Sequence, residues 1–358
     1  IQTLASLGRF DEARNTIKQI SDPRLTIVSL RETAVALAHG GQFTTAEQVT
    51  TLIPDPANKA RAYAAIAAEY AKSSQPALAK AAAAAMQREF RLTQDKLAVV
   101  DIAASLSVAL ARRGAATLSK SILLDLQTSL TTLPNDNDKR AVLGMLATAY
   151  AKIGSLSEAE SILKPYEISA KQPMYLATVE YLAKRGEVER AIATLKQLRQ
   201  PRHYVAAMHH IAKAQAKLAN TSGAHATLKR AMNAVTDIER PFALNIALTQ
   251  IAEAWIYMAN FANAQKTLRK VGDHVLKARS LWNFAANAKE LGFAEQAEAL
   301  KRSASKATKE IPSAFDRTAT LLHATQLEII SQQGSKINSS LFTFFDFSVS
   351  IIFLKMKS

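Results

Sequence analysis

The residues with the clearest potential for chemistry are the cations of a stretch without carboxylates, residues 190–236. Between these bounds the sequence has no Asp or Glu, and it holds four of the seven histidines of the chain. Its basic and titratable members are Arg190, Lys196, Arg199, Arg202, His203, His209, His210, Lys213, Lys217, His225, Lys229 and Arg230. Such a cluster attracts acidic groups or polyanions, so this stretch is the leading candidate for a binding surface.

Three of these side chains share one face of a helix. His209, Lys213 and Lys217 recur every four residues, the spacing that aligns side chains along a helix. Cations are most often solvated surface, and a Lys or Arg near a helix end is favoured by the helix dipole. We therefore interpret Lys217 alone as helix-end charge and treat the whole stretch as the hypothesis. Its candidate binding residues are His209, Lys213, Lys217, Arg202, His203 and His210.

Recognisable motifs for catalysis and cofactor binding are absent from the sequence. It contains no GxxxxGK phosphate loop and no HExxH zinc motif. It also has no cysteine, which excludes disulfides, cysteine-based metal sites and cysteine nucleophiles. His209 and His210 are adjacent and point about 100° apart on a helix, a poor start for a shared metal. We expect no catalytic residue, no metal and no cofactor.

A helical repeat must position these residues. Throughout the chain, pairs of small residues recur with a separation of five positions. We call the first residue of each pair the turn marker. The turn markers are Gly8, Gly41, Ser74, Gly114, Gly154, Gly186, Ala219, Ala259 and Gly292. Successive markers lie 33, 33, 40, 40, 32, 33, 40 and 33 residues apart. Apolar or small residues form one helical stripe before each marker and a second stripe after it. The pattern predicts helical hairpins that bury their apolar faces against neighbouring hairpins.

The longer intervals and the helix starts fit the same repeat. The intervals of 40 exceed those of 33 by 7 residues, close to two helical turns, so the buried stripes stay nearly in phase. A capping Asp before a Pro predicts helix starts at Asp22-Pro23 and Asp55-Pro56. By similar logic we expect helices to open at Asn135 to Asp138, Pro173, Pro201, Pro241 and Pro312. A Lys or Arg two residues before a marker, as in Lys72, Arg112, Lys152, Lys184 and Lys217, suits the negative helix end.

These residues resemble the tetratricopeptide repeat family. Leu146, Ala147, Tyr150, Gly154 and Ala159 follow that family's order of large apolar, small, aromatic, turn glycine and alanine. The resemblance covers residues 1–334 and is degenerate, because three intervals exceed the usual period of about 34. It implies an all-α fold, a right-handed αα-superhelix or solenoid of about nine to ten hairpins. We expect its first helix to be truncated at Ile1, and residues 335–358 to form an atypical apolar tail.

The resemblance also implies a function, because the first helix of each pair lines a concave groove in that family. The implied role is a non-catalytic scaffold that binds a protein or peptide partner in the groove. The residues that it places on the groove face are Ala206, His209, Lys213, Ala216 and Lys217. Glu180 and Glu253 take groove positions in flanking units and would limit a basic patch. No unit carries the Lys and Asn pair with which some members hold a C-terminal carboxylate.

The charge balance leaves two classes of partner. With 45 basic and 30 acidic residues, the formal charge of +15 favours an acidic protein or peptide. The alternative is RNA or single-stranded nucleic acid, bound as pentatricopeptide arrays bind it. Against this alternative, the repeat spacing varies between 32 and 40, and Tyr204 is the single aromatic residue of the acid-free stretch. An enzyme is the least favoured class.

The C-terminal tail departs from the repeat pattern. Five of the thirteen phenylalanines fall within residues 341–354, which also include Asp346. The segment is shorter than the roughly 20 apolar residues of a spanning helix, so we expect no transmembrane segment. It would cap the last hairpin, bind a partner or be foreign to the native protein. The oligomeric state and the compartment are not indicated by the sequence, with a soluble protein of the cytoplasm as the default.

Overall fold

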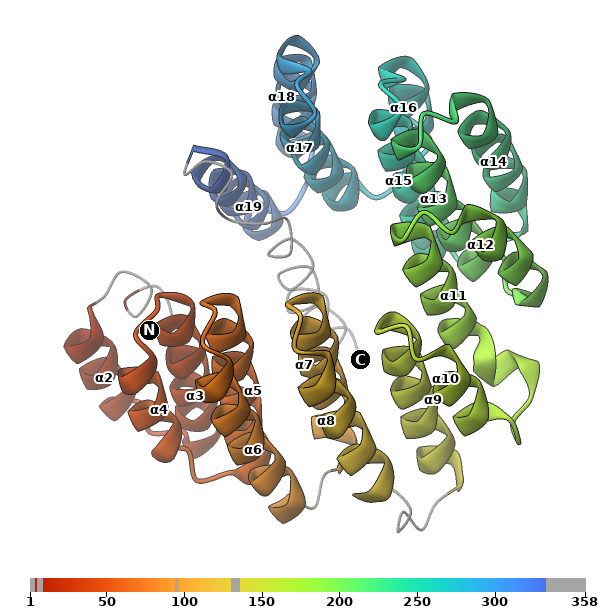
Figure 1. Cartoon of the computed structure of the whole chain (residues 1–358). Helices are drawn as coiled ribbons and strands as arrows, with labels where there is room; N and C mark the ends of the chain where they lie inside the picture. The colour runs from red at the N-terminus through yellow and green to blue at the C-terminus, as the bar shows by residue number, and fades with distance from the viewer. Residues whose placement is uncertain (1–3, 5–8, 94–95, 130–135, 333–358) are drawn as a thin grey trace. The chain divides into compact units, whose positions relative to one another are not determined.

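The structure, a computed structural model, describes residues 4, 9–93, 96–129 and 136–332. Within these ranges the chain is all-helical and contains no strand, which confirms the predicted all-α helical-repeat fold. Successive helices run in antiparallel pairs joined by short turns (Figure 1). No helix in these ranges is both long and apolar enough to cross a membrane. Gly8 and the tail at 335–358 lie outside the described residues.

The chain divides into two compact units, an N-terminal unit of residues 1–200 and a C-terminal unit of residues 201–358. In the N-terminal unit, α2 (Phe10–Lys18) precedes hairpins that each join a first helix to a second helix. These hairpins are α3 (Pro23–His39) with α4 (Phe43–Thr51), α5 (Pro56–Lys72) with α6 (Pro76–Leu92), α7 (Lys96–Arg112) with α8 (Ala116–Ser129), α9 (Asp136–Lys152) with α10 (Leu156–Leu163), and α11 (Ile168–Lys184) with α12 (Val188–Thr194). A 3₁₀ turn, η1 (Leu195–Gln197), follows α12.

The C-terminal unit repeats the same arrangement. Its hairpins are α13 (Pro201–Lys217) with α14 (Thr221–Ala234), α15 (Pro241–Tyr257) with α16 (Phe261–Leu268), and α17 (His274–Glu290) with α18 (Ala294–Lys309). The 3₁₀ turn η2 (Val235–Asp237) follows α14, and α19 (Ala314–Gln332) follows α18. Within each unit, every first helix packs against the next first helix along the chain. Equivalent positions of neighbouring hairpins therefore form rows across each unit.

Helix length explains the two repeat intervals. The first helices from α3 to α17 are all 17 residues long. The second helices differ, with 9 residues in α4 and 8 in α10 and α16, but 17 in α6 and 14 in α8 and α14. Of the long second helices, α6, α8 and α14 lie in the three intervals of 40, and α18, with 16 residues, follows the last marker. The added turns therefore lengthen the second helix and leave the first helices alike.

The turn markers have the backbone conformation that ends a helix. All eight markers within the described ranges have positive φ, from 55° at Ala259 to 88° at Gly292. The residue that follows each marker donates its backbone N–H to a carbonyl in the last turn of the preceding helix. At the marker Ala219, for example, Asn220 N donates to the Gln215 carbonyl at 2.8 Å. Glycine adopts this conformation freely, whereas Ser74, Ala219 and Ala259 hold it against the clash of their Cβ atoms. The predicted position of the turn is confirmed.

Most of the predicted helix starts are also confirmed. The Asp22 carboxylate accepts a hydrogen bond from Arg24 N, and α13 and α15 begin at Pro201 and Pro241. The prediction that Pro173 opens a helix is wrong, because α11 begins five residues earlier at Ile168. Pro173 lies within α11 beyond its first turn, where it removes one backbone hydrogen bond and its ring crowds the carbonyl of Ser169.

The side chain of Gln172 fixes the start of α11 ahead of that proline. Its amide nitrogen donates to the carbonyls of Ile168 and Gln197, at 3.0 and 2.9 Å. Its amide oxygen accepts from the backbone nitrogens of Arg199 and Gln200. Gln172 is fully buried, so all of these bonds are sheltered from water. They tie the first turn of α11 to the segment that follows η1.

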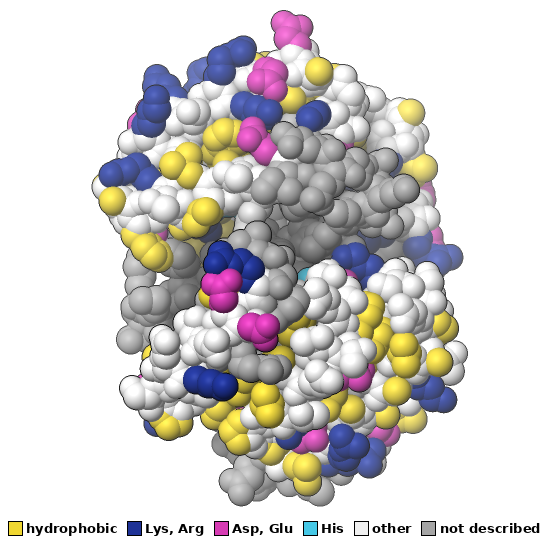
Figure 2. Space-filling model, turned by 90° about the vertical axis from the view of Figure 1, so that its left-hand side faces the viewer, with side chains coloured by type: hydrophobic (Ala, Val, Ile, Leu, Met, Phe, Trp, Pro, Cys, Tyr) yellow, Lys and Arg dark blue, Asp and Glu magenta, His cyan; other side chains and the backbone are white. Residues whose placement is uncertain are grey.

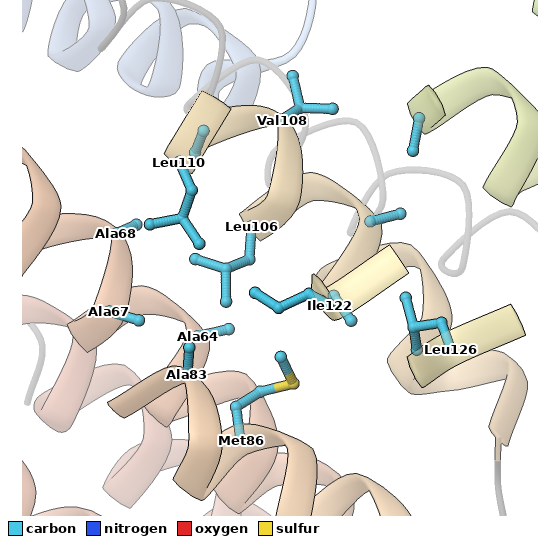
Figure 3. Close-up of a cluster of buried hydrophobic side chains, with 14 of the residues drawn as sticks. Ala64, Ala67, Ala68, Ala83, Met86, Leu106, Val108, Leu110, Ile122 and Leu126 are labelled. Carbon is cyan, nitrogen blue, oxygen red and sulfur yellow. The ribbon is translucent and has the colours of Figure 1, made fainter. Parts of the chain in front are cut away.

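The core of each unit consists of alanine on facing helices with large aliphatic side chains between them. Figure 3 shows this packing between the α5–α6 and α7–α8 hairpins, where Met86, Leu106 and Ile122 lie close together between the helices. Ala67 and Ala83 are fully buried and let the backbones approach, while Met86, Leu106 and Ile122 fill the space that remains. This packing fixes the first helices side by side and so positions the side chains on their outer faces.

Candidate binding surface on the first helices

The six binding residues predicted on α13 have different surroundings. His209 is buried with 5% of its surface exposed, His203, His210 and Lys213 are partly exposed, and Arg202 and Lys217 are exposed. Arg202 stands at the start of α13 and Lys217 at its end, about 22 Å apart along a helix that rises 1.5 Å per residue. The structure therefore brings His209 and Lys213 together but keeps the two exposed cations apart.

A carboxylate from the next first helix lies between His209 and Lys213. The Glu253 side chain on α15 is 3.0 Å from Nε2 of His209 and 2.8 Å from Nζ of Lys213. The Lys213 ammonium also lies over the ring of Tyr257, 3.9 Å from its centroid, where the π face attracts a cation. Burial raises the pKa of Glu253, but the hydrogen bonds and charges of His209 and Lys213 outweigh it and hold that pKa well below its usual range.

This cluster changes the meaning of the predicted basic surface. Glu253 was expected to limit the patch, and it neutralises one of the three cations that the helix spacing aligned. His209 is buried beneath the cluster, so a partner does not reach it. Lys217 is exposed and makes no ion pair with a described residue.

His203 adds little positive charge to α13 at neutral pH. Burial, and after it the charge of Arg202, lowers the pKa of His203 to about 4, so its imidazole is neutral at pH 7. The Nδ1 atom of His203 is buried without a hydrogen-bond partner among the described residues. The ring of His210 packs against that of His209 with centroids 5.0 Å apart. The charge of the acid-free stretch therefore comes from its Lys and Arg side chains, of which Lys213 is paired with Glu253.

A second set of cations forms a row on the N-terminal unit that sequence reasoning did not identify as a site. We define the basic row as the exposed side chains in the last turns of α3, α5, α7, α9 and α11. Its members are His39, Lys72, Arg112, Lys152 and Lys184. Because these helices pack side by side, the row runs across neighbouring hairpins. The sequence shows that a cation recurs two residues before most markers. Each of these cations was attributed to the negative end of its own helix, so the row as a whole was not identified.

Two carboxylates hold part of this row. Glu69 on α5 lies 3.0 Å from Nδ1 of His39 and 3.2 Å from Nζ of Lys72. Burial raises the pKa of Glu69, but His39 and Lys72 lower it more, so its carboxylate is charged at neutral pH. Glu180 on α11 pairs with Lys184 on its own helix and with Arg112 on α7 at 3.6 Å. Like Glu253, Glu69 joins two neighbouring first helices, whereas Glu180 joins α11 to α7, with α9 between them in the stack.

A shallow pocket opens around Glu180 at the ends of α7, α9 and α11. Its volume is about 200 Å³, and its polar lining consists of Arg112, Lys152, Glu180, Tyr181, Lys184 and Arg185. The Tyr181 ring lies against the turn at Gly154, where an added Cβ would stand 2.2 Å from its Cζ and Oη atoms. The pocket holds four cations and one carboxylate. Its lining is therefore basic overall.

The described residues contain no group of three or more His, Cys, Asp and Glu side chains placed to share a metal ion. Lys and Arg side chains are spread over the face drawn in Figure 2, in several places beside exposed hydrophobic side chains. The chemistry that the surface offers is thus the attraction of acidic groups next to apolar contacts.

Comparison with known proteins gives no functional guide. No family model matches the chain, and no curated protein matches it. Among solved structures, the chain is similar to the crystal structure of Ton1535 from Thermococcus onnurineus NA1, with 17% sequence identity and a TM-score of 0.38. That similarity covers 90% of this chain and 97% of the other. A similarity this distant carries no argument about function.

Proposed function

We propose that this protein is a non-catalytic, tetratricopeptide-like scaffold that binds an acidic segment of a partner protein along its first helices. The observation that carries the proposal is the basic row. Four permanent cations and one histidine stand at equivalent places on five successive first helices, and two carboxylates face them. The excess charge lies on exposed side chains, which reach a partner without any change of the fold.

The spacing of the row favours an extended ligand. The axes of packed helices lie about 8–10 Å apart, which sets the spacing of the backbone positions of the row, while the side-chain ends of Arg112 and Lys184 converge on Glu180. A polyproline-II segment rises about 3.1 Å per residue with three residues per turn, so every third side chain returns to the same face after about 9.3 Å. A segment with an acidic residue at every third position would therefore pair with successive helices.

The experiment measures binding of the full chain to labelled ligands of equal charge by fluorescence anisotropy. The probe is a fluorescein-labelled peptide of repeated Glu-Pro-Ala units, and its control has the same composition with the Glu residues adjacent. We expect the spaced peptide to bind more tightly than its control and to weaken as salt is raised, because the contacts are between exposed charges.

A labelled single-stranded RNA of equal charge tests the alternative. We expect it to bind more weakly than the spaced peptide at physiological salt, because no Phe, Tyr or Trp belongs to the row and the Tyr181 ring beside it packs against the turn at Gly154. Absence of peptide binding would refute the scaffold proposal. Tighter binding of the RNA would replace it with nucleic-acid recognition.

A further inference from the structure

The pocket at the ends of α7, α9 and α11 has unused capacity for a negative group. Lys152 is exposed on its rim and makes no ion pair with any residue that the structure describes. Arg112 reaches Glu180 at 3.6 Å, a separation longer than a hydrogen bond, so the donors of its guanidinium are not saturated by that contact. These two cations stand on adjacent helices and line the same pocket.

We propose that this pocket is a carboxylate-binding site, in which an Asp or Glu side chain of the partner segment pairs with Arg112 and Lys152. The inference rests on the proposed function and assigns one subsite within it. Glu180 acts as an internal carboxylate that occupies part of the pocket when no partner is bound. An incoming carboxylate takes its place on Arg112, while Glu180 remains on Lys184 of its own helix.

Two observations favour a carboxylate as the ligand. The pocket already holds one, because Glu180 lies between Arg112 and Lys184 and so marks where a carboxylate is stable. The volume of about 200 Å³ is below the roughly 300–1,000 Å³ of ordinary small-molecule sites, so the pocket admits a side chain rather than a whole cofactor. The planar fork of an arginine matches two carboxylate oxygens, and a lysine adds a point charge beside it.

Changing a cation of the pocket and changing its carboxylate should have opposite effects on peptide affinity. Lys152→Glu should weaken binding of the spaced Glu-Pro-Ala peptide roughly 3- to 10-fold, because an exposed pair is replaced by a repulsion. Glu180→Gln should tighten binding roughly 2- to 5-fold, because the internal competitor loses its charge while its shape is kept. A purely structural role for Glu180 would not raise affinity, so this second variant separates the two roles.

The matched control is Lys80→Glu on α6. Lys80 is exposed, lies on a second helix away from the row and makes no ion pair with a described residue, so the same change of net charge occurs outside the pocket. We expect Lys80→Glu to alter affinity much less than Lys152→Glu. If the wild-type chain binds the peptide but Lys152→Glu and Lys80→Glu weaken that binding equally, the pocket assignment fails and the scaffold proposal stands. If the wild-type chain does not bind, both fail.

Competition identifies the group that the pocket prefers. Glutarate and inorganic phosphate are titrated against the bound peptide, using the wild-type chain and Lys152→Glu. A carboxylate site is supported if glutarate displaces the peptide from the wild-type chain at a lower concentration than phosphate does. In Lys152→Glu the two competitors should then act at similar concentrations. Displacement by phosphate at the lower concentration would overturn the carboxylate assignment in favour of a phosphate site.

Discussion

The His209 imidazole on α13 lies 3.0 Å from the Glu253 carboxylate on α15, through Nε2 and Oε2. The pair joins two successive first helices at a buried point, and Lys213 completes it from the same helix as His209. Glu69 makes the same kind of bridge between α5 and α3. Carboxylates on first helices thus connect neighbouring helices. The cations that they pair with are less available to a partner than the unpaired ones.

Removing the charge of Glu253 should destabilise the C-terminal unit. We expect Glu253→Gln to lower the free energy of unfolding by about 1–3 kcal/mol, because the buried His209 loses a charged partner. Both tryptophans, Trp255 and Trp282, belong to this unit, so fluorescence during urea unfolding reports on it. Glu239→Gln is the control, since Glu239 is exposed and makes no ion pair within the described ranges.

The effect of Glu253 should depend on pH in a defined direction. Its pKa is lower in the folded chain than in the unfolded chain, because His209 and Lys213 outweigh the effect of burial. The stabilisation is therefore fully present above the ordinary Glu pKa of about 4.3 and is lost as pH falls through the folded value. The difference between wild type and Glu253→Gln should be full at pH 5 and smaller at pH 3. An increase on acidification would contradict the bridge.

His203 should make the same unit sensitive to mild acid. Burial lowers its pKa to about 4, against about 6.5 in the unfolded chain. Between these values the unfolded chain takes up a proton that the folded chain does not, so stability falls as pH drops from 6.5 to 4. We expect a loss of roughly 2 kcal/mol, less than for a fully buried group. His203→Gln should remove it, whereas His274→Gln, at the exposed start of α17, should retain it.

The fold could be predicted from the sequence because the turn has a strict local requirement. Positive φ falls on the small residue of every described marker, so Gly154 and Ala219 identify helix ends without tertiary information. The interval pattern likewise predicted added helical turns, although the second helix as their location became visible only in the structure. Pro173 misled the prediction because Gln172 secures the helix start through backbone groups far along the chain.

The site was harder to predict because charge acts across helices. The composition of residues 190–236 contains no acid, yet Glu253 approaches from a helix outside this stretch. Lys152 resembled any helix-end cation until its place in a pocket beside Arg112 was known. Residue spacing along one helix predicts neither an ion pair between two helices nor a pocket formed by several helices. The binding role of the α13 residues stays a prediction, with Lys217 as its most accessible member.

Two alanine markers should be improved by glycine. Ala219 and Ala259 have φ of 57° and 55°, a conformation that costs an L residue roughly 1–2 kcal/mol. Part of that gain is offset by the greater freedom of glycine in the unfolded chain, so each substitution to Gly should stabilise the C-terminal unit by about 1 kcal/mol. Gly292→Ala is the reverse test, because no atom lies within 4 Å of the added Cβ and only backbone strain changes. It should destabilise by a similar amount in urea unfolding.

Charge reversal on α13 should separate binding from stability. Lys217→Glu changes an exposed side chain that pairs with no carboxylate of the described ranges, so it should weaken binding of the spaced Glu-Pro-Ala peptide and reduce the salt dependence of that binding. Lys213→Glu should instead lower stability, because it places a second carboxylate beside Glu253. Lys229→Glu on the exposed face of α14 is the control of equal charge change.

Anisotropy and urea unfolding on the same three α13–α14 variants give the two readouts. If Lys217→Glu binds the peptide as Lys229→Glu does, the groove face of α13 takes no part in partner binding. The basic row of the N-terminal unit would then carry the interaction by itself, because its cations stand on a different compact unit and are untouched by either substitution. If Lys213→Glu keeps full stability, the Glu253 bridge does not hold α13 to α15 in solution.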